Sequence, residues 1–215
     1  MGSITPTPCP AYWQTNIPPS AHTPHCPPSL QSLSQKDIRV LLTPDSASHI
    51  LTWPIVRHII RTNRLDLFQR KPSQLRKYLE YCYAIKQTHG SMMRFILDEK
   101  LHWKESELDA RDAPFSNEDE YKILINDWPY GIDEKIVHLV VWTKFALEDD
   151  PETGDTRDDV KREIQAWVDR VFGGGENVIW FRNWRSLKSI HSVEHFHVML
   201  YDPAPEFVKE VTGSI

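Results

Sequence analysis

The C-terminal stretch S-V-E-H-F-H-V-M-L-Y, residues 192–201, decides the expected fold of this chain. Its last seven residues form an aromatic and aliphatic run of the kind that makes a buried strand. Successive side chains of a strand point to opposite faces, so His195 and His197 share one face with Met199. Glu194 lies on the other face. The pattern therefore predicts a strand that is buried on both sides and carries two imidazoles on one of them.

Two imidazoles on one strand face lie about 6–7 Å apart, which suits several kinds of chemistry. They can serve as a nucleophile and its helper, as a proton-transfer pair, or as two metal ligands. A metal site needs a third ligand, for which His138 is the best candidate. Histidines on strands are also often structural, and the residues alone leave this alternative open. We predict no metal and no other cofactor.

Outward from this stretch, the second half of the chain reads as short strands around one helix. Strands are expected at 121–126, 137–145 and 178–182, with an amphipathic helix at 159–172 that ends at Gly173. The acidic segment 148–159 is expected as an exposed loop. The order contains no strand–helix–strand alternation, which favours an α+β fold with an antiparallel sheet.

The first half of the chain reads as helical after a proline-rich arm. Eight of the sixteen prolines fall within the first 28 residues, so residues 1–34 are expected as a flexible or loosely docked arm. Helices are expected to begin after Thr52, Ser73 and Ser91. We therefore predict one domain over 35–215, with a basic helical part at 35–104 and a sheet part at 120–215.

Charge and composition limit the classes of function. From residue 55 to 104 there are eleven basic and four acidic residues, whereas 105–159 holds five basic and seventeen acidic ones. A basic half can bind RNA despite the net charge of −5, although solvated helix faces explain the same pattern. The chain has no apolar run long enough for a membrane helix and no signal-peptide pattern. We expect a cytoplasmic protein without a membrane partner.

Two further segments place polar side chains at strand ends. Asp127 and Trp128 follow one strand in a turn that ends in proline and glycine, where a carboxylate can pair with a cationic substrate. A plain turn explains the same residues. At the end of another strand, Arg182 and Asn183 can bind a phosphate or carbonyl group, and Trp184 can stack on a ring.

Several segments together resemble a fungal family labelled N-acetylglucosamine-induced protein 1-like, a domain of unknown function. The resemblance extends from Trp53 to the C-terminus. It is carried by these segments: K-P-S-Q-L-R (71–76), H-G-S-M (89–92), Y-K-I-L (121–124), N-D-W-P-Y-G (126–131), H-L-V-V-W (138–142), W-F-R-N-W (180–184) and E-H-F-H-V (194–198). Some members of this family are arginine-containing cyclodipeptide synthases, which join arginine and a second amino acid from aminoacyl-tRNA as a diketopiperazine.

The resemblance implies a set of expected roles. His197 is the expected nucleophile or general base, His195 its proton-transfer partner, and Asn183 the stabiliser of the developing oxyanion. Asp127 or Glu194 is expected to bind the arginine guanidinium, because a carboxylate makes the bidentate pair. Glu194 points off the histidine face, which favours Asp127. Other expected substrate contacts are Trp128, Trp184, Arg182 and His138, and expected RNA contacts are Arg70, Lys71, Arg76 and Lys77.

A second resemblance is to the histidine-triad (HIT-like) fold, whose members finish with Ser-Val-x-His-x-His-x-His. Residues 192–197 match that pattern, but Met199 stands at the third histidine. This implies a HIT-like antiparallel sheet with an N-terminal helical segment, and His197 in the place of a covalent nucleophile. The alternatives to a cyclodipeptide synthase are therefore a histidine-triad-like nucleotide hydrolase or transferase, and a non-catalytic binding protein. The sequence leaves open the second amino acid and the oligomeric state.

Overall fold

The structure, a computed structural model, describes residues 11–108, 113–184 and 193–213. Its centre is a four-stranded sheet in the order β1-β2-β4-β3, antiparallel at every pairing. The strands are β1 (Tyr121–Ile125), β2 (Ile136–Thr143), β3 (Val178–Phe181) and β4 (Glu194–Tyr201). The predicted α+β class and antiparallel sheet are confirmed.

The helices precede, interrupt and follow the sheet. The α-helices are α1 (Gln35–Leu42), α2 (Trp53–Arg61), α3 (Pro72–His89), α4 (Met92–Phe95), α5 (Asp158–Phe172) and α6 (Pro205–Thr212). A π-helical segment, Ile96–Leu101, continues α4. Short 3₁₀ turns lie at Tyr12–Gln14, Pro19–Ala21, Pro28–Leu30, Asp45–Ala47, Leu65–Leu67, Glu105–Glu107 and Glu118–Glu120. In the described residues no helix is long and apolar enough to cross a membrane.

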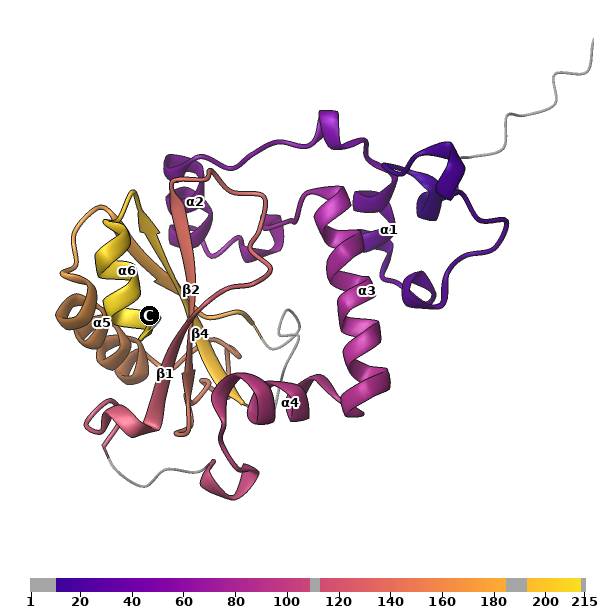
Figure 1. Ribbon diagram of the computed structural model, residues 1–215. Helices are drawn as coiled ribbons and strands as arrows, with labels where there is room; N and C mark the ends of the chain where they lie inside the picture. Colours follow the sequence, from indigo (N-terminus) through magenta and orange to yellow (C-terminus); the bar gives the residue numbers. More distant parts are fainter. Residues whose placement is uncertain (1–10, 109–112, 185–192, 214–215) are drawn as a thin grey trace, which may run out of the picture.

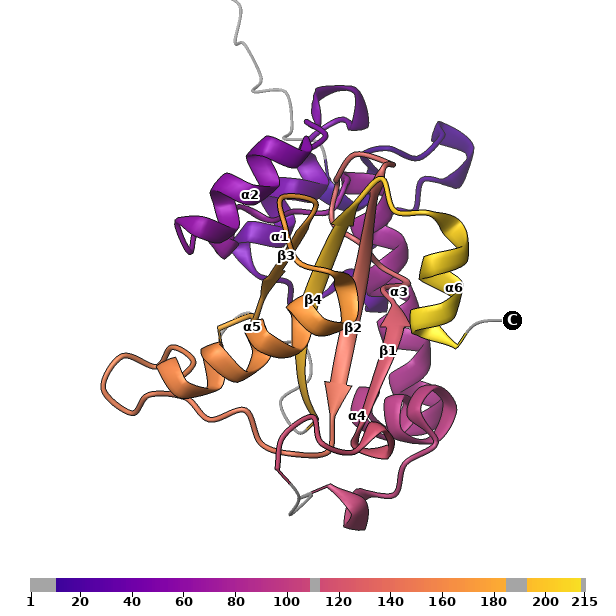
Figure 2. The same cartoon turned by 90° about the vertical axis from the view of Figure 1, so that its left-hand side faces the viewer.

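The sheet is covered on both faces, as the apolar strand residues require (Figures 1 and 2). On one face α5 and α6 pack over Phe196 and Val198, which are fully buried around Trp167 of α5. On the other face α2 packs against Met199, and α4 with the π-helical segment packs against Trp142. The predicted division of β4 into a histidine face and a Phe196 face is thus confirmed.

Helix ends follow the predicted capping only in part. Ser91 accepts a hydrogen bond from the backbone of Arg94, as an N-cap does, and Gly90 ends α3 with a φ of 77°. The prediction that Ser73 caps α3 is wrong. The helix begins one residue earlier at Pro72, and the backbone N–H of Ser73 is capped by the Asp45 carboxylate at 2.9 Å. A carboxylate distant in sequence thus replaces the local cap.

The proline-rich arm is docked from residue 11 onward, which differs from the expectation of a flexible segment. Leu30 is fully buried beside Leu41 of α1 and Leu75 of α3. The Tyr12 hydroxyl donates to the carbonyl of Leu30 at 2.8 Å, and Arg76 donates to the carbonyl of Trp13. These three anchors supply the burial and hydrogen bonds that the proline-rich composition did not suggest. Residues 1–10 lie outside the described residues.

Candidate functional site

A cavity of about 490 Å³ lies between the histidine face of the sheet and helices α3 and α4. Its walls are mostly aromatic, because α3, α4 and the turn after β1 all direct rings towards it. The floor is the sheet itself. The lining residues are Arg70, Tyr78, Tyr81, Met92, Phe95, Ile96, Lys100, Leu124, Ile125, Asn126, Asp127, Trp128, Tyr130, Val140, Trp142, Asn183, His195 and His197.

Three histidines meet at the floor of this cavity. His138 on β2 and His197 on β4 are joined by a hydrogen bond of 3.0 Å between Nε2 and Nδ1. Both are at least nine-tenths buried, and β2 and β4 are adjacent strands in the sheet. His195 stacks near Trp142, with 4.5 Å between ring centroids, and its Nδ1 lies 2.9 Å from the carbonyl oxygen of Val193. The sheet therefore brings together the three histidines that the sequence singled out.

The hydrogen bonds of the turn after β1 determine where the protons of this pair lie. Asn126 Oδ1 accepts from the backbone N–H of Trp128 at 2.9 Å, and its Nδ2 lies 3.2 Å from Nδ1 and 3.4 Å from Nε2 of His138. Nε2 also lies 3.0 Å from Nδ1 of His197, so we assign the amide hydrogen bond to Nδ1 of His138. An amide nitrogen only donates, which makes Nδ1 of His138 the unprotonated nitrogen. Nε2 of His138 then carries the proton and donates it to His197 Nδ1. The proton of His197 is consequently on Nε2.

Asn183 completes this array by accepting from His197. With Asn183 Nδ2 placed 3.1 Å from His197 Nε2, two donors face each other, and Oδ1 is buried without a partner among the described residues. A half-turn of the amide exchanges its oxygen and nitrogen and removes the clash of donors. Asn126 cannot turn instead, because Trp128 N–H holds its oxygen. Asn183 thus orients His197, and this geometry favours a positioning role over the expected oxyanion role.

Both members of the histidine pair are neutral at neutral pH. Burial, with a smaller contribution from the Arg70 guanidinium, lowers the pKa of His138 to about 3. Burial is also the main cause that holds the pKa of His197 well below its usual value, followed by the nearby His138, His195 and Arg70. A neutral imidazole can accept a proton or attack a carbon centre, which an imidazolium cannot.

These lowered pKa values predict a pH-dependent stability. In the unfolded chain a histidine titrates near pH 6.5, so below this pH the unfolded state binds protons that the folded state excludes. The free energy of unfolding should therefore fall as pH drops from about 6.5 towards 3, by up to about 1.4 kcal/mol per pH unit for each histidine. Urea unfolding at several pH values measures this slope.

Two substitutions separate the buried pair from other titrating groups. His138→Gln should reduce the slope of the free energy of unfolding against pH by about the contribution of one histidine. His58→Gln, on the exposed face of α2, should leave this slope unchanged. His197→Gln provides a second test should His138→Gln fold poorly. Equal slopes in the wild type and both buried-site variants would contradict the neutral pair.

The expected arginine-binding acids separate in the structure. Asp127 lines the cavity at its mouth, where its carboxylate is half exposed and pairs with Lys100 at 2.6 Å. Glu194 lies on the opposite face of β4 and pairs with Arg182 at 2.9 Å. The geometry thus supports the preference for Asp127 and does not bring Glu194 to the cavity.

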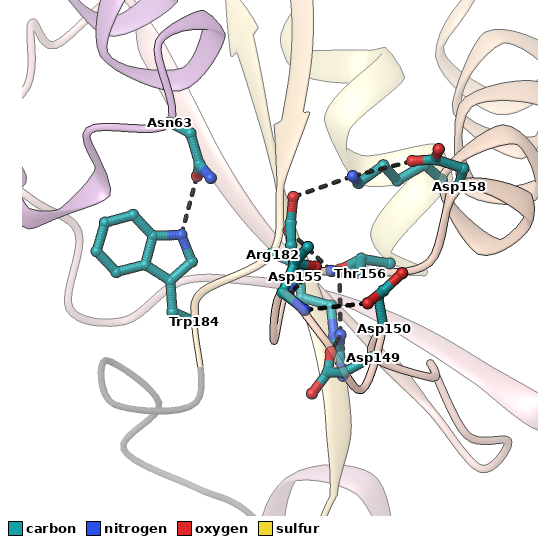
Figure 3. A network of polar contacts seen from close by, with 10 residues as sticks. Asn63, Asp149, Asp150, Asp155, Thr156, Asp158, Arg182 and Trp184 are labelled. Carbon is teal, nitrogen blue, oxygen red and sulfur yellow. Dashed lines mark hydrogen bonds and ion pairs between the residues drawn. The ribbon is translucent and has the colours of Figure 1, made fainter.

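Arg182 and Trp184 are also turned away from the cavity. Arg182 is buried, pairs with Asp149 and Glu194, and donates to the hydroxyl of Thr156 at 3.1 Å. This ties β3 and β4 to the acidic segment between β2 and α5, part of which is therefore held and not a free loop. Figure 3 shows the Trp184 indole directed at Asn63 and away from these acidic residues. Both residues act in packing here, and their expected substrate contacts are not formed by this arrangement.

The expected RNA-binding residues fall into three environments. Arg70 lies inside the cavity, over the ring of Tyr78. Arg76 is buried under the docked arm, so it offers no surface to RNA. Lys71 pairs loosely with Asp45 at 3.8 Å, and Lys77 is exposed on α3.

Sequence reasoning missed Asn126 and Lys100 as members of the site. Asn126 is the last residue of the strand expected at 121–126, and its contact with His138 depends on the pairing of β1 with β2. Lys100 belongs to the π-helical segment, which ordinary helical spacing does not predict. The signal available for Asn126 was its place at the end of a strand that was expected to lie in the same sheet.

Together the fold and the site define an α+β protein with an aromatic-walled cavity over a buried, neutral histidine pair. The chain belongs to the family described as protein of unknown function (DUF3605), whose match covers residues 52–201. That range contains the histidines, Asn126, Asn183 and most of the cavity wall.

Proteins of two yeasts and one solved structure are similar to this chain. The chain is 31% identical over 182 residues to N-acetylglucosamine-induced protein 1 of Candida albicans, covering 74% of this chain and 72% of that protein. It is 28% identical over 166 residues to an uncharacterized protein of Saccharomyces cerevisiae, covering 74% and 82%. The crystal structure of HTC1 is similar with a TM-score of 0.61 and 28% identity, over 76% of this chain and 94% of HTC1. The expected likeness to the N-acetylglucosamine-induced family is confirmed.

Proposed function

We propose that this protein is an arginine-containing cyclodipeptide synthase that takes arginine from arginyl-tRNA and a second amino acid from another aminoacyl-tRNA. The observation that carries the proposal is the cavity: two imidazoles on its floor, of which that of His197 is neutral, several aromatic rings in its wall, and one carboxylate, that of Asp127. Its volume of about 490 Å³ accommodates two small acyl groups. The family resemblance supplies the choice of substrate.

The chemistry needs a proton acceptor and no ATP site. The α-amine of one aminoacyl group attacks the ester carbonyl of the other, forming an amide bond and releasing one tRNA 3′ oxygen. The amine of the dipeptidyl ester then attacks the remaining ester, which closes the ring and releases the second tRNA. In each step an imidazole takes the proton from the amine and passes it to the departing ribose oxygen.

We assign the proton transfer to His195, which lines the cavity. Its Nδ1 donates to the Val193 carbonyl at 2.9 Å, and this bond fixes the direction of the ring. The ring of His197 lies 5.6 Å from that of His195 and is held by His138 and Asn183. We therefore assign a positioning role to the His138–His197 pair.

Asp127 is the proposed partner of the arginine guanidinium. Its carboxylate is half exposed and is held by a single lysine, Lys100. A guanidinium can replace that ammonium with two parallel hydrogen bonds in place of one, which makes the exchange favourable for arginine over lysine.

Incubation with tRNA, arginine, the other amino acids, ATP and the matching synthetases tests the proposal, with mass spectrometry of the small molecules formed. A cyclo-arginyl dipeptide should appear and should vanish when RNase is added. His195→Gln should reduce its formation by about 10²-fold or more, whereas His58→Gln on the surface should have no effect. If no diketopiperazine forms with any amino-acid mixture, the proposal is wrong.

A separate measurement tests the alternative function, a nucleotide hydrolase of the histidine-triad type. That activity needs an available nitrogen on His197 for a covalent nucleotidyl intermediate. The bonds of His197 to His138 and Asn183 favour the aminoacyl reading. Labelling of His197 by a nucleotide, detected by mass spectrometry of the intact protein, would reverse this preference.

A further inference from the structure

The guanidinium of Arg70 is held rigidly inside the cavity. Its central carbon lies 3.9 Å from the centre of the Tyr78 ring and 5.6 Å from that of Tyr130. Its Nε donates to the carbonyl oxygen of Trp128 at 3.1 Å. Ring contacts use the faces of the guanidinium plane, and the Trp128 carbonyl uses one edge. None of these contacts uses the edge that carries Nη1 and Nη2.

That edge has no protein partner in the described part of the chain. Neither Nη1 nor Nη2 of Arg70 makes a hydrogen bond there, and the side chain forms no ion pair. Other partly or fully buried arginines differ: Arg76 pairs with Glu80, and Arg182 with Asp149 and Glu194. Two parallel N–H groups on a fixed plane match the oxygens of a phosphate or carboxylate.

The charge balance of the cavity also favours a negatively charged ligand group at Arg70. Lys100 and Asp127 cancel each other across 2.6 Å, and the histidine pair is neutral. Arg70 is then an uncompensated positive charge among the described lining residues. A ligand that fills the cavity is more stable there if it brings one negative group to Arg70.

We propose that Arg70 binds the phosphate group of the 3′-terminal nucleotide of an RNA inside this cavity. The choice of RNA as the source rests on the proposed function, whereas the oxyanion site itself does not. Beside Arg70 the ring of Trp128 lies 5.8 Å from that of Tyr78 and 5.1 Å from that of Tyr81, and such a cluster can stack a base. A nucleotide uses both features, and a small carboxylate would use only the charge.

Titration with 5′-AMP and with adenosine, followed by tryptophan fluorescence and calorimetry, tests the site directly. AMP should bind wild-type protein at least about 10-fold more tightly than adenosine, because adenosine lacks the phosphate. Arg70→Met should remove that preference and leave adenosine binding nearly unchanged. Lys86→Met removes the same charge from the exposed face of α3 and should retain the preference. Arg70→Lys, which keeps the charge without the fork, should retain only part of it.

Three results would overturn the inference: no phosphate preference in the wild type, a preference that survives Arg70→Met, or an equal loss in Lys86→Met. Thermal unfolding of each variant shows whether the fold is intact. If Arg70→Met does not fold, the partial loss of the phosphate preference in Arg70→Lys is the test. The trinucleotide C-C-A with a free 5′ hydroxyl tests the source, and AMP binding more tightly than C-C-A would contradict RNA. Arg70-dependent binding without diketopiperazine formation refutes the proposed function alone, and synthesis without a phosphate preference refutes this site alone.

Discussion

Arg182→Ala is expected to lower the free energy of unfolding by about 3 kcal/mol. The Arg182 side chain is 4% exposed, pairs with Asp149 and Glu194, and donates to the carbonyl of Leu147 and the hydroxyl of Thr156. Its removal takes the buried guanidinium away from the carboxylates of Asp149 and Glu194. Both are partly exposed, so water compensates in part, and the loss stays at the lower end for a broken buried pair.

Urea unfolding measures this loss, and Arg157→Ala provides the matched control. Arg157 also pairs with two carboxylates, those of Glu148 and Asp159, but on the surface of the molecule. Exposed pairs contribute little, so this variant should remain close to the wild type. Similar losses in the two variants would mean that burial adds nothing to the Arg182 cluster.

Asn126→Asp is expected to reverse the protons of the whole histidine array. One carboxylate oxygen still accepts from Trp128 N–H, but the other now faces Nδ1 of His138 and can only accept. The proton of His138 moves to Nδ1, His197 then donates from Nδ1, and Asn183 turns to donate. The new charge also raises the pKa of His138 from about 3, because a carboxylate stabilises imidazolium.

Long-range ¹H–¹⁵N spectra of the histidine rings distinguish the two states, since protonated and unprotonated ring nitrogens resonate apart. The wild type should show the His138 proton on Nε2 and the variant should show it on Nδ1. Asn63→Asp adds the same charge beside Trp184, away from the array, and should change neither. The argument for the proton positions is wrong if the wild type and Asn126→Asp share one pattern. Under the proposed function, diketopiperazine formation should also fall in Asn126→Asp, because the altered His197 ring lies 5.6 Å from that of His195, the proposed proton-transfer residue.

The sheet was predictable because each strand has a pattern of its own. All four strands were placed within a few residues, since apolar residues that are buried on two faces leave a dense signal. Helices α1 and α6 were not predicted. They are eight residues each and are stabilised by their packing, α1 under Leu30 and α6 against the Phe172 end of α5. Such short helices depend on tertiary contacts more than on local sequence.

The site was predictable as a set of residue types and only partly as an arrangement. Strand alternation correctly placed His195 and His197 on one face and Glu194 on the other. The position of Arg70 in the cavity and of Arg182 outside it depends on how loops return to the sheet. A single sequence contains no information on such pairings of distant residues beyond charge and size.

The central pairing of β2 with β4 also determines when the site can exist during folding. His138 and His197 are 59 residues apart in the chain, and α5 and β3 lie within the loop between them. Closing a loop of this length costs entropy before any contact is gained, so sheets of this kind fold slowly, in about milliseconds to seconds. Fragments that end before β4 lack His197, so they contain no histidine pair. The ribosome must therefore synthesise β4 before the sheet that forms the floor of the cavity can assemble.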